Sequence, residues 1–179
     1  MKLFARFILY TILGWETVGN FPKKLNKYVI IAAPHTHWVD FPLGILINWA
    51  ENLSANYIGK DALFKPPFGF IFRWLGGAPV DRTKNSNKVD AIVDVFNTKD
   101  KFILGMSPEG TRKKVTSWKT GFYYIAKGAN VPVVIVAFDF KNKKIKIAEP
   151  YYLTDNKEED FNFFYKQVDG VVGKIPEYS

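Results

Sequence analysis

The sequence predicts a single α/β domain, built from a mixed, mostly parallel sheet flanked by helices and extending over residues 1–179. Two observations support this fold class. Short apolar runs occur at 28–33, 102–106 and 131–136, and each has the length and composition of a buried strand. Between them lie helix-length stretches whose apolar residues recur at helical spacing, and alternating strands and helices are typical of α/β proteins. The 179 residues are enough for one domain with a substantial core.

Residues 1–20 predict an N-terminal apolar helix, with Lys2 and Arg6 near its start. Its uncharged stretch, from Phe7 to Trp15, has nine residues. A membrane span needs ~20, so this segment is not expected to cross a bilayer. Basic residues followed by aromatic ones suit a helix lying in the membrane interface, and a helix that packs on the sheet fits equally well. No secretory cleavage site follows, so no signal peptide is expected.

The remaining elements can be assigned in chain order. The first half predicts a strand at 28–33, a helix at 39–50, a strand at 56–60, a turn at 65–69, an aromatic helical turn at 70–75 and an extended segment at 78–82. The second half predicts a helix at 83–98, a strand at 102–106, a helix at 121–129, a strand at 131–136, a hairpin turn at 141–144, a strand at 145–148 and a helix at 156–174. The core face of this last helix is expected to carry Phe161, Phe164, Tyr165, Val168 and Val172.

Composition narrows the functional classes. The net charge is +8 and the pI is about 9.5, which favours an anionic partner such as nucleic acid, an anionic membrane surface or a phosphorylated substrate. Cysteine is absent, so disulfides, cysteine-ligated zinc and a cysteine nucleophile are excluded. Two histidines are too few for a histidine-rich metal site.

Both histidines lie in one heptad, Pro34–Asp40, between a predicted strand and a predicted helix. Open α/β sheets usually place their sites at such strand ends. On one continuous helix His35 and Asp40 would point ~140° apart, at ~100° per residue. If they cooperate, His35 lies in the turn and Asp40 in the first helical turn, where its carboxylate can hold one imidazole nitrogen and leave the other free to take a proton. The other interpretation is a polar turn that caps a helix.

Three further stretches bear on an anionic substrate. The segment 76–82 combines two glycines with Arg82, whose guanidinium can bind a phosphate bidentately. The segment 107–112 follows a buried strand and holds Glu109, Gly110, Thr111 and Arg112. The segment 131–133 reads as core. An ordinary glycine turn and a polar loop after a strand are the structural alternatives for the first two.

In this order, His-x4-Asp, Gly-Gly-x-x-x-x-Arg, Pro-Glu-Gly-Thr-Arg and Val-Pro-Val resemble the four ordered blocks of the glycerolipid acyltransferases, the family of lysophosphatidic acid acyltransferase. The likeness covers roughly residues 28–140. It includes the connectors 57–63 and 67–69, and the stretch 118–121 with Ile125 and Ala126. Four blocks in order are far more specific than any one of them. The resemblance implies the glycerol-3-phosphate acyltransferase-like fold.

The resemblance also implies a reaction, acyl transfer from an acyl thioester to a lipid hydroxyl without an acyl-enzyme. His35 would be the general base and Asp40 its orienting carboxylate. The acceptor's anionic head group would be bound by Arg82, Glu109, Gly110, Thr111 and Arg112, with Lys60 of the connector also at the substrate site. His37 stands where the family usually has serine, and is either a second polar group over the acceptor or structural.

The expected partners are a lyso-lipid acceptor, acyl-CoA or acyl carrier protein as co-substrate, and a membrane surface, with no further cofactor, no metal and no nucleic acid. The lysines are spread along the chain, and no nucleic-acid motif is present. The expected location is the cytoplasmic face of a membrane, peripheral rather than transmembrane. Pro34 and His37 depart from the family pattern, so a monoacylated amino-acid lipid is an alternative acceptor. A basic protein that binds membranes without catalysis is the competing function.

Overall fold

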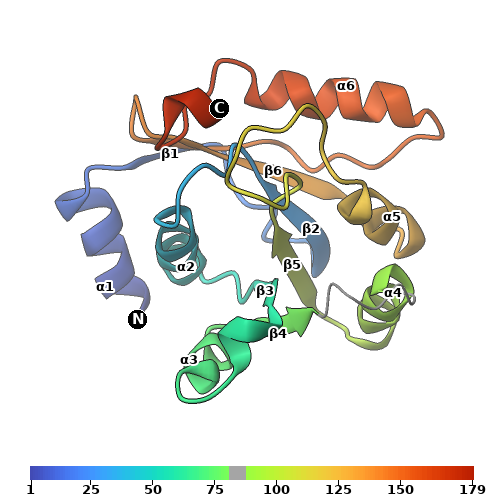
Figure 1. The fold of residues 1–179 in the computed structure, drawn as a ribbon, viewed down its shortest axis with the longest axis horizontal. Helices are drawn as coiled ribbons and strands as arrows, with labels where there is room; N and C mark the ends of the chain where they lie inside the picture. The colour runs from blue at the N-terminus through green and yellow to red at the C-terminus, as the bar shows by residue number, and fades with distance from the viewer. Residues whose placement is uncertain (81–87) are drawn as a thin grey trace.

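The computed structural model describes residues 1–80 and 88–179, and its central element is a seven-stranded sheet (Figure 1). The strand order is β1-β7-β6-β2-β5-β3-β4. The strands are β1 (Glu16–Val18), β2 (Lys27–Ala32), β3 (Asn56–Lys60), β4 (Gly77–Val80), β5 (Phe102–Met106), β6 (Val133–Asp139) and β7 (Lys144–Ile147). All neighbouring pairs are parallel except β6 and β7, which form an antiparallel hairpin. The predicted mixed, mostly parallel sheet is therefore confirmed.

The centre of the sheet consists of β6, β2 and β5, and these are the apolar runs of the sequence. Every residue of β6 is buried, as are the four residues from Tyr28 to Ile31 in β2. Strands covered by helices on both faces are continuously apolar rather than alternating. The register aligns Ile31 of β2 with Met106 of β5 and with Ile135 of β6. The carboxyl ends of these three strands therefore meet at one edge.

Helices cover both faces of the sheet. The helix α1 (Lys2–Arg6), the π-helix η1 (Phe7–Ile12) and the helix α2 (Asp40–Glu51) share one core cluster. On the opposite face are α4 (Lys88–Thr98), α5 (Gly121–Gly128) and α6 (Lys157–Val168), with a second cluster. Two short pieces, the 3₁₀ turn η2 (Asp61–Phe64) and α3 (Gly69–Trp74), lie beside β4 (Figure 1). Across the described residues, no helix has the length and apolar character required to span a membrane.

Most predicted elements are confirmed to within three residues, but two helices are shorter than predicted. The N-terminal helix predicted over residues 1–20 ends at Ile12, because the chain then turns into the edge strand β1. The last helix, α6, is also shorter than predicted. It ends at Val168 rather than 174, and Gly170 follows with a φ of +67°. Tyr165 is exposed rather than in the core, and Val172 lies outside any helix. The three-residue edge strand β1 and the 3₁₀ turn η3 (Pro176–Tyr178) were not predicted. The predicted segments 78–82 and 83–98 lie partly outside the described residues.

Phe122 on α5 provides a test of the second core cluster. Its ring is 1% exposed and contacts the rings of Phe161, Phe164 and Trp118. Replacing it in Phe122→Ala leaves a cavity and should lower the free energy of unfolding by about 3–5 kcal/mol. Urea unfolding measures this change. Tyr124→Ala, two positions along and 48% exposed, is the control and should cost less than about 1 kcal/mol. Similar losses in both variants would contradict this placement of the core.

Candidate active site

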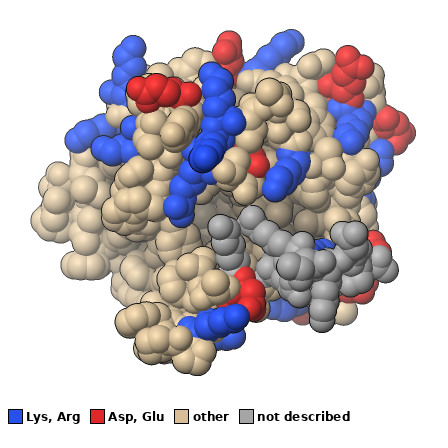
Figure 2. Space-filling view, in the orientation of Figure 1, with Lys and Arg blue, Asp and Glu red and all other residues tan. Residues whose placement is uncertain are grey.

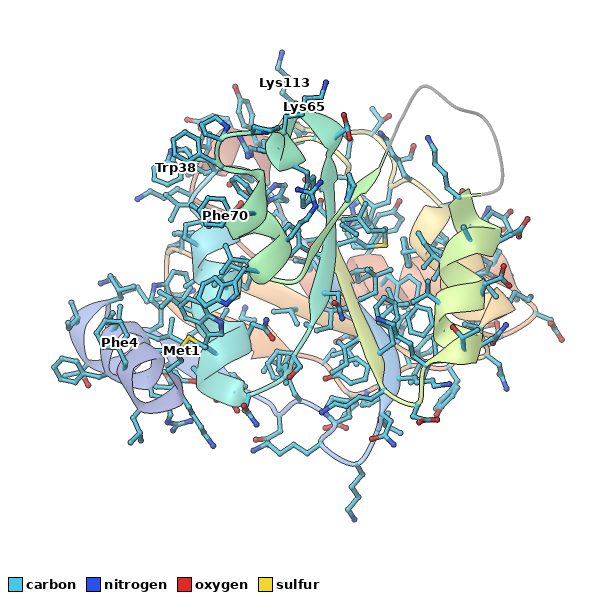
Figure 3. The ribbon with its side chains drawn as sticks, turned by 90° about the horizontal axis from the view of Figure 1, so that it is seen from below. Met1, Phe4, Trp38, Lys65, Phe70 and Lys113 are labelled. Carbon is cyan, nitrogen blue, oxygen red and sulfur yellow. The ribbon has the colours of Figure 1, made fainter. Side chains whose placement is uncertain are left out.

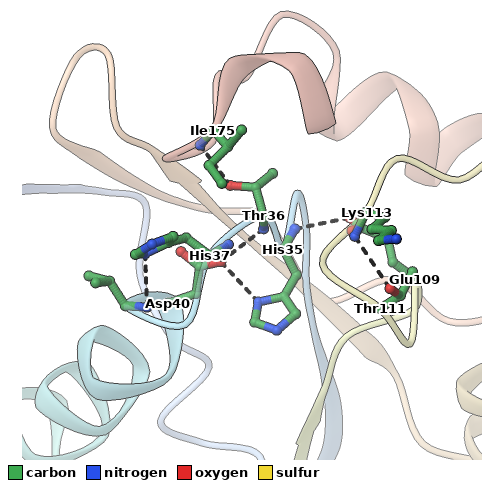
Figure 4. Close-up of polar contacts among 9 residues, drawn as sticks. His35, Thr36, His37, Asp40, Glu109, Thr111, Lys113 and Ile175 are labelled. Carbon is green, nitrogen blue, oxygen red and sulfur yellow. Dashed lines mark hydrogen bonds and ion pairs between the residues drawn. The ribbon is translucent and has the colours of Figure 1, made fainter.

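The turn between β2 and α2, called here the histidine turn (residues 33–39), is organised by Asp40 at the start of α2. The Oδ2 atom of Asp40 lies 2.9 Å from Nδ1 of His35. The same oxygen accepts hydrogen bonds from the backbone N–H groups of Thr36, at 2.9 Å, and His37, at 3.0 Å (Figure 4). Three donors therefore converge on one carboxylate oxygen, and the predicted contact between His35 and Asp40 is present.

Burial and helix position both fix the Asp40 carboxylate in place. Its side chain is 3% exposed, and it lies in the first turn of α2, where the helix dipole favours negative charge. The His35 side chain is 23% exposed. When Nδ1–H donates to the carboxylate, the other ring nitrogen, Nε2, carries the lone pair. The pair is thus arranged to accept a proton at Nε2 of His35.

Glu109 holds the backbone of His35 from the neighbouring strand. It lies in the loop after β5, which is adjacent to β2, and its Oε1 accepts a hydrogen bond from the His35 N–H at 3.0 Å. The Glu109 side chain is buried. Burial raises the pKa of Glu109 to about 7, and the hydrogen bond from His35 opposes this rise only in part. The negative charge of Asp40 adds to it.

The residues that follow Glu109 turn back toward the surface. Gly110 has a φ of +65°, and a Cβ atom there would lie within 3 Å of the Lys119 side chain. The Thr111 hydroxyl accepts a hydrogen bond from the Lys113 N–H at 3.3 Å, and both Thr111 and Arg112 are exposed (Figure 4). The structure thus brings Glu109 to His35 and Asp40, and leaves Thr111 and Arg112 at the surface.

Three further predicted site residues are Arg82, Lys60 and His37, and the structure describes only the last of them in full. Arg82 lies outside the described residues, and the backbone of Lys60 ends β3 while its side chain is outside them. His37 contributes its N–H to Asp40, and its ring lies 5.6 Å from the Trp38 ring. Its Nδ1 accepts only a long hydrogen bond, 3.4 Å, from the Val39 N–H. Among the described residues, no cluster of three or more potential ligand side chains could hold a metal.

An apolar groove beside the histidine turn was not predicted. Its volume is about 1040 Å³. Trp38, Val39 and the first turns of α2 form one wall; its other walls are the N-terminal segment at Leu13 and Trp15, the β6–β7 hairpin, and residues 172–176. Lys141, Lys143 and Lys174 are among its lining residues. The helical spacing of Leu43 and Leu46 was the only sequence signal for it, and that spacing also fits core packing.

The raised pKa of Glu109 makes protein stability depend on pH. Its folded pKa of about 7 lies above its ordinary value of 4.5, so between these pH values the folded chain binds more protons than the unfolded chain. This contribution to stability is complete below about pH 4.5 and is lost as pH rises to about 7. Glu109→Gln removes this pH-dependent contribution. The free energy of unfolding of the variant minus that of wild type should therefore be higher at pH 8 than at pH 5 by roughly 2 kcal/mol. Urea unfolding at both pH values measures this difference.

The exposed Glu158 supplies the control for this experiment. The difference in stability between Glu158→Gln and wild type, measured at pH 5 and pH 8, is the baseline. If the difference for Glu109→Gln changes with pH no more than this baseline, burial does not favour the protonated form of Glu109 and the burial argument fails.

Comparison with known proteins gives consistent results. A family model described as Acyltransferase matches residues 16–139. The 1-acyl-sn-glycerol-3-phosphate acyltransferases of Haemophilus influenzae and Escherichia coli are each 31% identical to this chain, over 149 and 144 residues. Each match covers 78% of this chain but 60% and 59% of the relative, so the chain spans about three fifths of their length.

A solved structure shows the same fold. The crystal structure of the 1-acyl-sn-glycerophosphate (LPA) acyltransferase from Thermotoga maritima matches with a TM-score of 0.61 and 22% sequence identity. The match covers 92% of this chain and 73% of that one. The family model includes the histidine turn, Asp40 and Glu109 within its matched range. On the match over residues 16–139, the chain belongs to the acyltransferase family.

Proposed function

We propose that the protein transfers an acyl chain from an acyl thioester to the hydroxyl of a monoacylated lipid such as lysophosphatidic acid. The observation that carries this proposal is the 2.9 Å contact between His35 Nδ1 and the buried Asp40 carboxylate. Membership of the acyltransferase family supports the reaction class. The relatives named as 1-acyl-sn-glycerol-3-phosphate acyltransferases support the choice of acceptor.

The proposed step begins at Nε2 of His35, which takes the proton of the acceptor hydroxyl. The hydroxyl oxygen attacks the thioester carbonyl carbon and forms the new C–O bond. The C–S bond then breaks, and the leaving thiolate takes the proton back from the imidazolium. Asp40 keeps the ring oriented and compensates its transient positive charge, which is the general logic of a base supported by a carboxylate. The reaction needs no cofactor beyond the acyl-thioester co-substrate.

The substrates are proposed to be held by two kinds of surface. The anionic head group of the acceptor would be bound by Gly110, Thr111 and Arg112, together with Arg82 and Lys60. The apolar groove beside Trp38 would hold an acyl chain. The lysines that line the groove would attract the negatively charged groups of the molecule that carries this chain. Basic side chains are spread across the upper part of the face in Figure 2. They suit either donor, since coenzyme A and acyl carrier protein are both acidic.

Contact with a membrane surface is the second part of the proposal. On α1 and η1 the buried residues are Ala5 and Leu9, whereas Leu3, Phe4 and Phe7 are exposed. On and beside α3, Phe68, Phe70 and Trp74 are also exposed. Both elements flank α2. The first packs on it in the core, and the Trp74 ring of the second lies 5.9 Å from that of Trp49 on α2.

Figure 3 shows Phe4, Trp38 and Phe70 along one side of the molecule. Exposed aromatic side chains with lysines nearby suit the headgroup region of a membrane. A peripheral position on the cytoplasmic face follows from this proposal, because acyl-CoA and acyl carrier protein are met there.

The roles of the two histidines are separated by activity measurements. Purified protein is given labelled acyl-CoA or acyl carrier protein with lysophosphatidic acid, a zwitterionic lyso-lipid or a monoacylated amino-acid lipid. His35→Ala should lower kcat/KM by at least ~10³, the upper range for loss of a general base. His37→Ala is the matched control and should keep most of the activity.

Loss of activity in His37→Ala alone would reverse the assignment of the base. Acylation of the amino-acid lipid but not of lysophosphatidic acid would change the proposed acceptor. Vesicle binding with no acylated product would favour the non-catalytic membrane protein.

Membrane contact has its own test. Phe68 and Phe70 are 63% and 70% exposed, and burying each in a lipid interface should contribute about 1.5 kcal/mol or more. The double variant Phe68→Ser/Phe70→Ser should therefore partition at least ~10-fold less onto vesicles containing anionic lipid. Co-sedimentation measures this. Tyr152→Ser, which removes a side chain 57% exposed outside this surface, should partition like wild type. Equal binding by all three proteins would exclude α3 from the contact.

A further inference from the structure

We propose that the C-terminal segment (residues 171–179), acting through Thr36, is a positioning element for the His35–Asp40 pair. This inference rests on the proposed function in that it takes His35 as the reacting base. The C-terminal segment has no part in the four sequence blocks, and it lies on the far side of the histidine turn from α2 (Figure 4).

Thr36 is held from two sides. Its backbone N–H donates to Asp40 Oδ2 at 2.9 Å, and its hydroxyl oxygen accepts a hydrogen bond from the Ile175 N–H at 3.1 Å. The Thr36 residue is 1% exposed, so neither contact is readily replaced by water. Thr36 stands between His35 and His37, the two other donors to Asp40. A shift of Thr36 therefore disturbs all three hydrogen bonds to the carboxylate.

The C-terminal segment is itself closed by short-range hydrogen bonds. The Gly173 N–H donates to the Ser179 hydroxyl at 2.8 Å, and the Tyr178 N–H donates to the Ile175 carbonyl at 3.1 Å. At its start, the Val172 carbonyl accepts from the Phe140 N–H, at 2.9 Å, just beyond the end of β6. The segment is thus tied at its start to the residue that follows β6, and it is braced by its own hydrogen bonds where it contacts Thr36.

Packing at Gly173 brings the segment against the Thr36 side chain. A Cβ atom on Gly173 would lie 2.6 Å from both Cγ2 and Oγ1 of Thr36, a distance that side chains do not tolerate. The two residues are therefore in direct contact, with no space for adjustment. Because Val172, Gly173 and Lys174 also line the apolar groove, the same segment touches both the groove and the histidine turn. We infer that it keeps the two in fixed relation.

The test compares Thr36→Val with Thr36→Ser in the chain of residues 1–179. Valine keeps the shape of the side chain but removes the acceptor for the Ile175 N–H, whereas serine keeps that acceptor. Thr36→Val should lower kcat at least ~10-fold, since a misplacement of about 1 Å can cost ~10²-fold in rate. KM for both substrates should stay unchanged, and Thr36→Ser should restore most of kcat. Thr98→Val, which removes a hydroxyl at the end of α4, is the matched control and should keep wild-type kcat.

Amide hydrogen exchange gives a readout that does not depend on activity. In Thr36→Val the amides of residue 175 and of residues 36 and 37 should all exchange faster, while those of β5 stay protected. If only residue 175 exchanges faster, or if kcat is unchanged, Thr36 does not position the pair and the inference is wrong. If Thr36→Val fails to fold, Ser179→Ala, which loosens the segment without touching the turn, should show the same pattern more weakly. Wild type that acylates no acceptor would overturn the proposed function, and the exchange data would still decide whether the segment holds the turn.

Discussion

The convergence of three donors on Asp40 Oδ2 is the constraint on which the site depends. An isolated carboxylate would be costly to bury. For Asp40 this cost is offset by two backbone N–H groups, one imidazole N–H and the N-terminal end of α2. To reach one oxygen, residues 35–37 must fold tightly over the start of the helix. The orientation of the His35 ring is therefore set by the same interaction that stabilises the turn.

Sheet order supplies the remaining contacts, because it brings together segments that are distant in sequence. Placing β5 beside β2 puts Glu109 against the backbone of His35, although 74 residues separate them. On its other side β2 is paired with β6, and Phe140, the residue after β6, donates a hydrogen bond to the Val172 carbonyl. Three residues further along, the Ile175 N–H donates to the Thr36 hydroxyl. The histidine turn is thus held by the two strands that flank its own strand. A parallel sheet with this order fixes the turn more firmly than its local sequence alone would.

Those parts of the fold that depend on local pattern could be predicted from the sequence. The central strands are uniformly apolar because they are buried on both faces, and the five-residue spacing of His35 and Asp40 is itself local. The predicted end of the last helix was wrong because Val172 happens to continue the helical spacing of Phe161 and Phe164, whereas the helix stops before Gly170. The contact between Thr36 and Ile175 joins a hydroxyl to a backbone N–H across 139 residues, and no periodicity reports such a contact. The groove was not predicted for the same reason, because its walls come from four segments that are separate in the sequence.

Glu109 and Asp40 are both buried beside His35 but act on different parts of it. Glu109 holds the backbone N–H, whereas Asp40 holds the ring. Two ionised carboxylates this close repel each other, and the charge of Asp40 contributes to the raised pKa of Glu109. With its pKa at about 7, Glu109 is partly protonated at neutral pH and still accepts the hydrogen bond from His35. Asp40 Oδ2 lies 2.9 Å from the ring nitrogen Nδ1, whereas Glu109 contacts only the backbone of His35. In the proposed reaction the positive charge formed on His35 is therefore balanced mainly by Asp40, and Glu109 serves chiefly to keep the backbone in place.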